Sequence, residues 1–119
     1  MNPGIRKVLS HLSETAITDM EIVEYATQQA FRSVVQNEIQ DYVTINRKGW
    51  QKLPVGLQRT VLRQAVMQVK QNTVDLKYSG VEEARDVLNS NASTGQIAIL
   101  SDVRIAVTPA DFTVKTVRD

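Results

Sequence analysis

The chain has 119 residues, of which 42% are hydrophobic and 5% aromatic, and its formal net charge is +1 at neutral pH. This length corresponds to one domain with a modest core. The absence of cysteine excludes disulfides, thiolate metal sites and a cysteine nucleophile. No apolar run approaches the ~20 residues of a membrane span and no secretory pattern opens the chain, so we expect a cytoplasmic protein or a fragment of one.

The small net charge hides two stretches of opposite sign. Residues 10–41 contain six acids and a single cation, Arg32, whereas residues 42–74 contain six cations and no acid. The six cations are Arg47, Lys48, Lys52, Arg59, Arg63 and Lys70. Such a cluster attracts phosphate, so these residues are our candidates for RNA binding. The alternative stays open that a basic helix pairs its charges with an acidic helix packed beside it.

The first third of the chain has a helical pattern. Asn2 and Pro3 form a helix start, and apolar residues follow at three- and four-residue steps. Thr18 and Glu21 have the spacing of an internal capping box. Either one helix of about 35 residues spans residues 3–37, or two shorter helices meet at this box. We favour the single helix, because the apolar register continues without a slip.

Residues 41–46 alternate between polar and β-branched side chains and predict a short strand. Residues 47–49 read as a turn, after which Trp50 and Leu53 are expected to anchor the chain in the core.

The stretch 53–71 predicts the central helix. Pro54 supplies the fixed φ of a first helical turn. The apolar residues that follow at helical steps are Leu57, Val61, Leu62, Ala65, Val66 and Val69. At ~100° per residue, Arg59, Arg63 and Lys70 fall within an arc of about 40° beside that apolar side. We therefore expect one side of this helix to pack in the hydrophobic core and the adjacent side to present three cations.

The rest of the chain completes an α+β pattern. After a polar connection over residues 72–78, Ser79 and Glu82 form a second capping box, followed by a short helix that ends at about Asn89. The residues of this helix expected to be buried are Val81, Ala84, Val87 and Leu88. A loop over residues 89–95 leads to three β-branched segments, 96–100, 103–108 and 112–117.

These last three segments predict a three-stranded antiparallel meander, which the 41–46 segment joins as a fourth strand. We therefore expect an α+β fold with a linking helix over residues 1–37 and a small α+β domain over residues 38–119.

No catalytic set is visible in the sequence. The glycines are scattered, so there is no glycine-rich phosphate loop, and His11 has no evident partner. The best carboxylate cluster, at Glu82, Glu83 and Asp86, offers too few ligands for a metal site and is better explained by its place near a helix N-terminus. Trp50 suits a core position better than base stacking. The chemistry left to this chain is binding, without a cofactor or metal of its own.

Four segments occur in the order found in one known family. The opening NPGIRKVLSHL, then LPVGLQRTVLRQAV, GVEEARDVL and the closing TGQIAILSDVRIAV together resemble the region that follows the catalytic domain in tRNA(Ile)-lysidine synthases. In that family Asn-Pro begins the helix that leaves the nucleotide-binding domain. The family's central-helix pattern is matched here by Leu53, Pro54, Leu57, Gln58, Arg59, Leu62 and Arg63.

The resemblance covers about residues 2–115. Thr94 and Gly95 match a threonine-glycine pair that precedes a β-hairpin in the family. The sequence departs from the family where Leu100-Ser101 replaces a frequent Leu-Pro, and where Gln96 replaces a frequent basic residue.

The resemblance implies the activity of a parent enzyme. Lysidine synthases use ATP to adenylate the wobble cytidine of an isoleucine tRNA and then displace AMP with the amine of lysine. ATP and magnesium belong to an upstream PP-loop domain, whose serine-glycine-glycine-x-aspartate-serine motif is absent from this sequence. The resemblance therefore implies a non-catalytic, tRNA-positioning fragment, with tRNA(Ile) and a PP-loop domain in cis as partners and no membrane contact.

Two other functions stay open. The chain would be a protein–protein or interdomain docking module without RNA contact if its first helix presented an exposed apolar stripe. A free-standing enzyme is the least favoured, because no catalytic group has been found.

Overall fold

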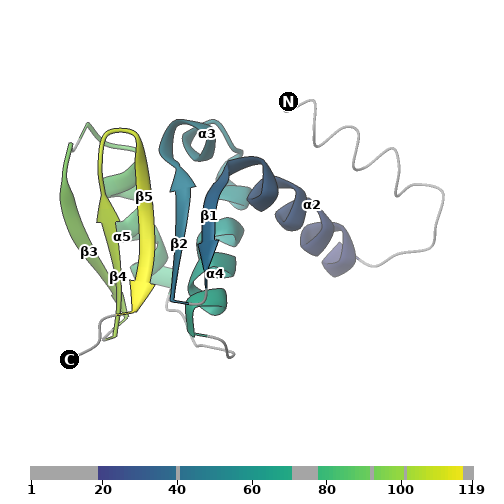
Figure 1. The fold of residues 1–119 in the computed structure, drawn as a ribbon. Helices are drawn as coiled ribbons and strands as arrows, with labels where there is room; N and C mark the ends of the chain where they lie inside the picture. The colour runs from purple at the N-terminus through teal and green to yellow at the C-terminus, as the bar shows by residue number, and fades with distance from the viewer. Residues whose placement is uncertain (1–18, 40, 71–77, 92, 101, 117–119) are drawn as a thin grey trace.

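An antiparallel sheet with helices packed on one of its faces makes this an α+β fold, as predicted (Figure 1). The structure is a computed structural model and describes residues 19–39, 41–70, 78–91, 93–100 and 102–116. The elements in chain order are α2 (Asp19–Val34), β1 (Val35–Ile39), β2 (Tyr42–Asn46), α3 (Arg47–Gln51), α4 (Val55–Lys70), α5 (Tyr78–Leu88), β3 (Gly95–Leu100), β4 (Val103–Val107) and β5 (Asp111–Thr116).

The strand order is β1-β2-β5-β4-β3, and each neighbouring pair is antiparallel. Strands β3, β4 and β5 form the predicted meander. Strand β2 pairs with β5 as the predicted fourth strand, with Ile45 opposite Phe112. The two faces of β2 differ in burial, as the alternation of its residue types predicts. Val43 and Ile45 are fully buried, whereas Tyr42 and Thr44 are half-buried.

Helix α4 buries its apolar side between the sheet and its neighbouring helices α2 and α5. The six apolar residues predicted for this side are all buried: Leu57, Val61, Leu62, Ala65, Val66 and Val69. Trp50 is fully buried beside them, with its ring centroid 5.4 Å from that of Phe112 in an edge-to-face contact. Its Nε1–H donates to the Gln58 carbonyl (3.2 Å). Trp50 is thus confirmed as a core anchor and is not available to stack on a base.

The expected helix over residues 3–37 is wrong at its C-terminal end. Helix α2 ends at Val34, and the next residues form β1 against β2. The helical spacing hides this end, because strand pairing is a tertiary interaction that overrides local preference. Ala30, Phe31 and Val34 belong to the same core as the sheet, so the expected domain boundary at residue 37 falls inside β1. The expected helix start at Asn2-Pro3 lies outside the described residues.

Residues 47–49, predicted to form a turn, belong instead to the short helix α3. The Asn46 side chain caps this helix by accepting a hydrogen bond from the Gly49 N–H (2.7 Å). A Cβ atom on Gly49 would lie 3.1 Å from Asn46 Oδ1 and 3.2 Å from Val34 Cγ1. The glycine that indicated a turn is therefore explained by the close approach of α3 to the end of α2.

The capping box predicted at Ser79 and Glu82 is wrong, because Tyr78 already belongs to α5 and Ser79 lies within that helix. The helix ends at Leu88, close to the predicted end at Asn89. Of the four residues expected to be buried, Val87 is half-buried and the other three are fully buried: Val81, Ala84 and Leu88. Residues 72–77 of the expected connection lie outside the described ranges.

Two valines of α4 offer a matched test of this packing. Val61 is fully buried and Val55 is 48% exposed. We expect Val61→Ala to lower the free energy of unfolding by about 2 kcal/mol, since it removes buried methyl groups and leaves a cavity. Val55→Ala should leave it unchanged or raise it slightly, because alanine has the higher helix propensity. Urea unfolding followed by Trp50 fluorescence measures both, and equal losses would contradict the described orientation of α4.

Candidate nucleic-acid interface

Arg47, one of the six candidate cations, lies in the interior and is only 3% exposed. Its guanidinium donates to the carbonyls at the end of α5: Nε to Leu88 (3.1 Å), and Nη2 to Val87 (3.3 Å) and Ser90 (3.0 Å). Nη1 donates to the Thr108 carbonyl at the end of β4 (2.9 Å). The last carbonyls of a helix have no partner within the helix and carry partial negative charge, which explains why a buried cation is accepted here. Arg47 is therefore a structural residue, and we remove it from the RNA-binding candidates.

Arg59 is held by α5. Its Nε lies 2.6 Å from Oε1 of Glu82, whose Oε2 is 2.7 Å from Nη1 of Arg85. The Arg59 hydrogen bond, assisted by the charges of both arginines and opposed by desolvation, holds the pKa of Glu82 below its usual value. Arg85 also donates a hydrogen bond to the Gln58 side chain (3.1 Å). The side chains of Arg59, Glu82 and Arg85 therefore link α4 to α5. Glu82, first noted as part of a carboxylate cluster, is thus an ion-pair partner.

Lys70, at the end of α4, forms an ion pair with Asp102, in the turn that connects β3 to β4. The hydrogen bond from Lys70 lowers the pKa of Asp102, although partial desolvation opposes the shift. The pair fixes the C-terminal end of α4 against the β3–β4 hairpin. Two of the three cations predicted beside the apolar side of α4 are therefore paired with acids from other elements.

The remaining candidates are exposed. Lys48 lies in α3 and Lys52 at its C-cap, just beyond the end of β2. Arg63 lies on α4, on the side that faces α2. The structure therefore does not gather the six candidates into one basic surface, but separates them into interior, paired and exposed groups.

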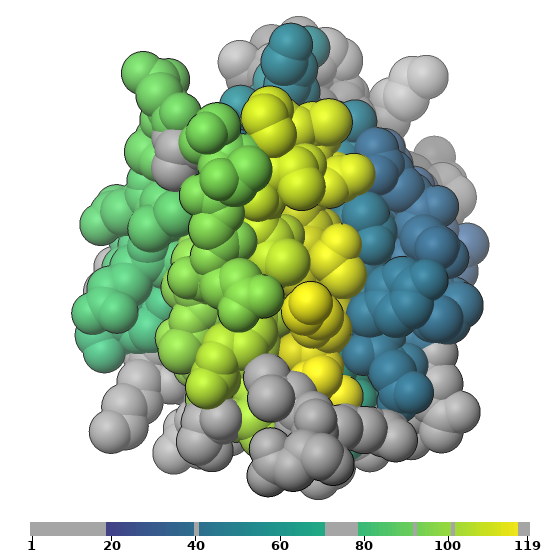
Figure 2. Space-filling model, turned by 60° about the vertical axis from the view of Figure 1, so that its left-hand side comes forward, coloured from purple at the N-terminus to yellow at the C-terminus, as the bar shows by residue number. Residues whose placement is uncertain are grey.

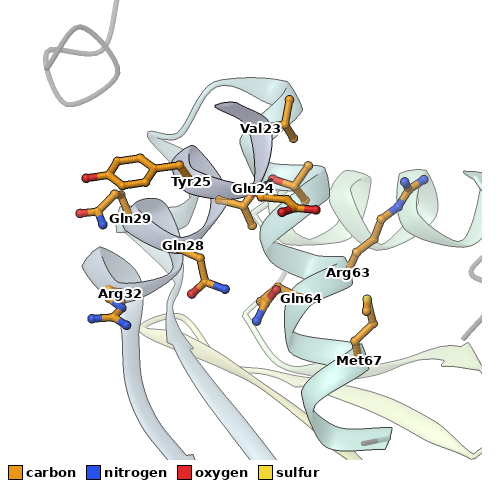
Figure 3. Close-up of a pocket in the computed structure, with 11 residues that line it drawn as sticks. Val23, Glu24, Tyr25, Gln28, Gln29, Arg32, Arg63, Gln64 and Met67 are labelled. Atoms are coloured by element: carbon orange, nitrogen blue, oxygen red, sulfur yellow. Dashed lines mark hydrogen bonds between the residues drawn. The ribbon is translucent and has the colours of Figure 1, made fainter. Parts of the chain in front are cut away.

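A groove of about 720 Å³ lies between α2 and α4, a feature that the sequence did not indicate (Figure 3). In Figure 3 side chains of α2 line one wall, and Arg63, Gln64 and Met67 of α4 line the other. A second hollow of about 330 Å³ shares three of its residues and extends to Glu38 of β1 and Gln68 of α4. The lining mixes amides, charges of both signs and apolar groups.

Apolar side chains are unusually exposed around this groove. Met20 and Val23, three residues apart on α2, are 71% and 49% exposed, and Met67 is 42% exposed. Met20 and Val23 continue the helical spacing of the buried Ala30 and Val34 along α2, as the sequence indicated, but they are exposed. Met67 lies away from the buried side of α4. Such a surface is typical of contact with another protein segment or domain.

The described residues include no group of three or more histidine, cysteine, aspartate or glutamate side chains placed to hold a metal ion. Within the same residues, no helix combines the length and apolar character needed to cross a bilayer. His11 lies outside the described ranges. Comparison of the chain with protein-family models and with curated proteins gave no match.

Adjacent residues of α3 provide a test of the assignment of Arg47. Hydrogen bonds to a charged group contribute about 1.5–3 kcal/mol each, so Arg47→Gln should lower the free energy of unfolding by more than about 3 kcal/mol. Lys48→Gln removes the same charge from an exposed position and should change it by less than about 0.5 kcal/mol. Equal stability of the two variants in urea unfolding would show that the Arg47 contacts do not support the fold.

Proposed function

We propose that this chain is the tRNA-positioning domain of a tRNA(Ile)-lysidine synthase, without catalytic activity of its own. The observation that carries the proposal is the order of the family-like segments along nearly the whole chain. In the complete enzyme, ATP and magnesium would be bound by an upstream PP-loop domain in the same polypeptide. This domain would hold the isoleucine tRNA so that its wobble cytidine reaches that site.

The fold gives physical reasons for several residues of the family-like segments. Leu57 and Leu62 are buried in the core, and Gln58 is buried with hydrogen bonds to the Trp50 and Gln51 carbonyls (3.3 and 3.0 Å). Gly95 has a φ of +155°, a conformation that other residues rarely adopt, at the start of the β3–β4 hairpin. These residues support the resemblance at the level of the fold.

The exposed cations are the groups left for RNA. Lys48 and Lys52 are exposed, in α3 and at its C-cap, and α3 directly follows β2 in the chain. A lysine ammonium binds phosphate as a point charge and needs no fixed geometry, which suits a domain that positions RNA through its backbone. Arg63 lines the groove instead, beside Met67.

A second candidate function is interdomain docking through the α2–α4 groove. The exposed Met20 and Val23 form the apolar stripe expected of a docking helix, and Met67 extends it across the groove. The partner would be the upstream PP-loop domain. This function is compatible with RNA binding elsewhere on the domain, and it would be favoured if the chain did not bind RNA.

The test is the binding of an isoleucine tRNA transcript to the 119-residue chain, measured by fluorescence anisotropy at several salt concentrations. We expect affinity to fall steeply with salt, since each lysine on a phosphate releases a counterion. The double variant Lys48→Gln/Lys52→Gln should bind about three- to tenfold more weakly, with a salt slope smaller by about 1–2.

The matched control is Arg32→Gln, which removes an exposed positive charge from α2 and should bind like the wild type. If the chain shows no salt-dependent binding, the RNA proposal is wrong. Binding of a separately supplied PP-loop domain, weakened by Met67→Ser, would then favour docking.

A further inference from the structure

The two walls of the α2–α4 groove carry opposite charges that are not paired with each other. Glu24 of α2 lines one wall and Arg63 of α4 the other, and both side chains are exposed. Neither takes part in the ion pairs or side-chain hydrogen bonds among the described residues. In Figure 3 the Arg63 side chain extends outward from α4 rather than toward Glu24. A surface that keeps an acid and a base apart is complementary to a partner with the reverse arrangement.

Each wall also has an exposed methionine one helical turn away from its charge. Met20 precedes Glu24 by four residues on α2, and Met67 follows Arg63 by four residues on α4. Residues four apart lie on one face of a helix, about 6 Å apart along its axis. The two helices therefore present a methionine and a charge at the same spacing, with opposite sign and in opposite order along the chain.

This arrangement is complementary to a second copy of the same chain. If α2 of one copy packs antiparallel to α4 of the other, Glu24 meets Arg63 of the second copy while Met20 meets its Met67. A two-fold axis produces both contacts twice, because the two copies use the same surface. The exposed Val23 is buried in the same contact, and the flexible methionine side chains can adapt to it.

Other occupants of the groove fit less well. An RNA backbone would bring phosphates close to Glu24, a like charge, and no cation is paired with that carboxylate among the described residues. A foreign protein domain would have to supply matching charges, whereas a second copy supplies them by symmetry. The formal net charge of only +1 gives little repulsion between two copies.

We propose that the α2–α4 groove is the interface of a two-fold symmetric homodimer, in which Glu24 of each copy pairs with Arg63 of the other. This inference does not depend on RNA binding. Lys48 and Lys52 do not line the groove, so dimer formation and RNA binding can be tested separately.

The experiment is sedimentation equilibrium of the 119-residue chain at a series of concentrations. We expect a reversible dimer for the wild type. Glu24→Arg and Arg63→Glu each place like charges together twice in the dimer, so each should raise the dissociation constant at least about tenfold. In an equimolar mixture of the two variants, a copy with two arginines meets a copy with two glutamates. The mixture should therefore form a heterodimer with an affinity close to that of the wild-type dimer.

The matched control is Glu83→Arg, the same substitution at an exposed position of α5 outside the groove, and it should dimerise like the wild type. Urea unfolding checks that each variant is folded. A wild-type chain that stays monomeric at every concentration would overturn the inference, even if its groove binds a PP-loop domain. A dimer that tolerates both single variants, or a mixture that forms no heterodimer, would also overturn it.

Discussion

The buried guanidinium of Arg47 connects parts of the chain that are far apart in sequence. It binds the Leu88 carbonyl, 41 residues away, and the Thr108 carbonyl, 61 residues away, while its own N–H donates to the Ala110 carbonyl (3.1 Å). The end of β2, the end of α5 and the β4–β5 turn therefore meet at one side chain. Because several carbonyls depend on this one cation, the register of β2 against β5 and the position of α5 are coupled.

The six cations of residues 42–74 thus have different structural roles. Arg47 completes a helix end, while Arg59 and Lys70 join α4 to α5 and to the β3–β4 hairpin through Glu82 and Asp102. Partly exposed ion pairs of this kind contribute little individually, but here they link α4 to α5 and to the β3–β4 hairpin. The exposed cations among the six candidates are consequently Lys48 and Lys52, in α3 and at its C-cap, and Arg63 in the α2–α4 groove.

The sequence predicted elements with a strong period and missed features that depend on distant partners. The apolar spacing of α4 and the alternation in β2, β4 and β5 were enough to place them, because each pattern follows directly from which side is buried. Strand β1, with its polar sequence Val35–Ile39, shows no such alternation and forms through its pairing with β2. Arg47 could not be distinguished from the neighbouring Lys48, since its acceptors come from residues much later in the chain.

The most direct test of this account is the ¹H–¹⁵N correlation spectrum of the chain during titration with an isoleucine tRNA transcript. If the chain binds RNA through its exposed lysines, the largest changes should appear at the amides of Lys48 and Lys52 and their neighbours in α3. The amides around Val23 and Met67 in the α2–α4 groove should change little. Changes confined to the groove, or an unaltered spectrum at concentrations of tRNA that saturate a micromolar site, would contradict the proposed RNA binding through these lysines.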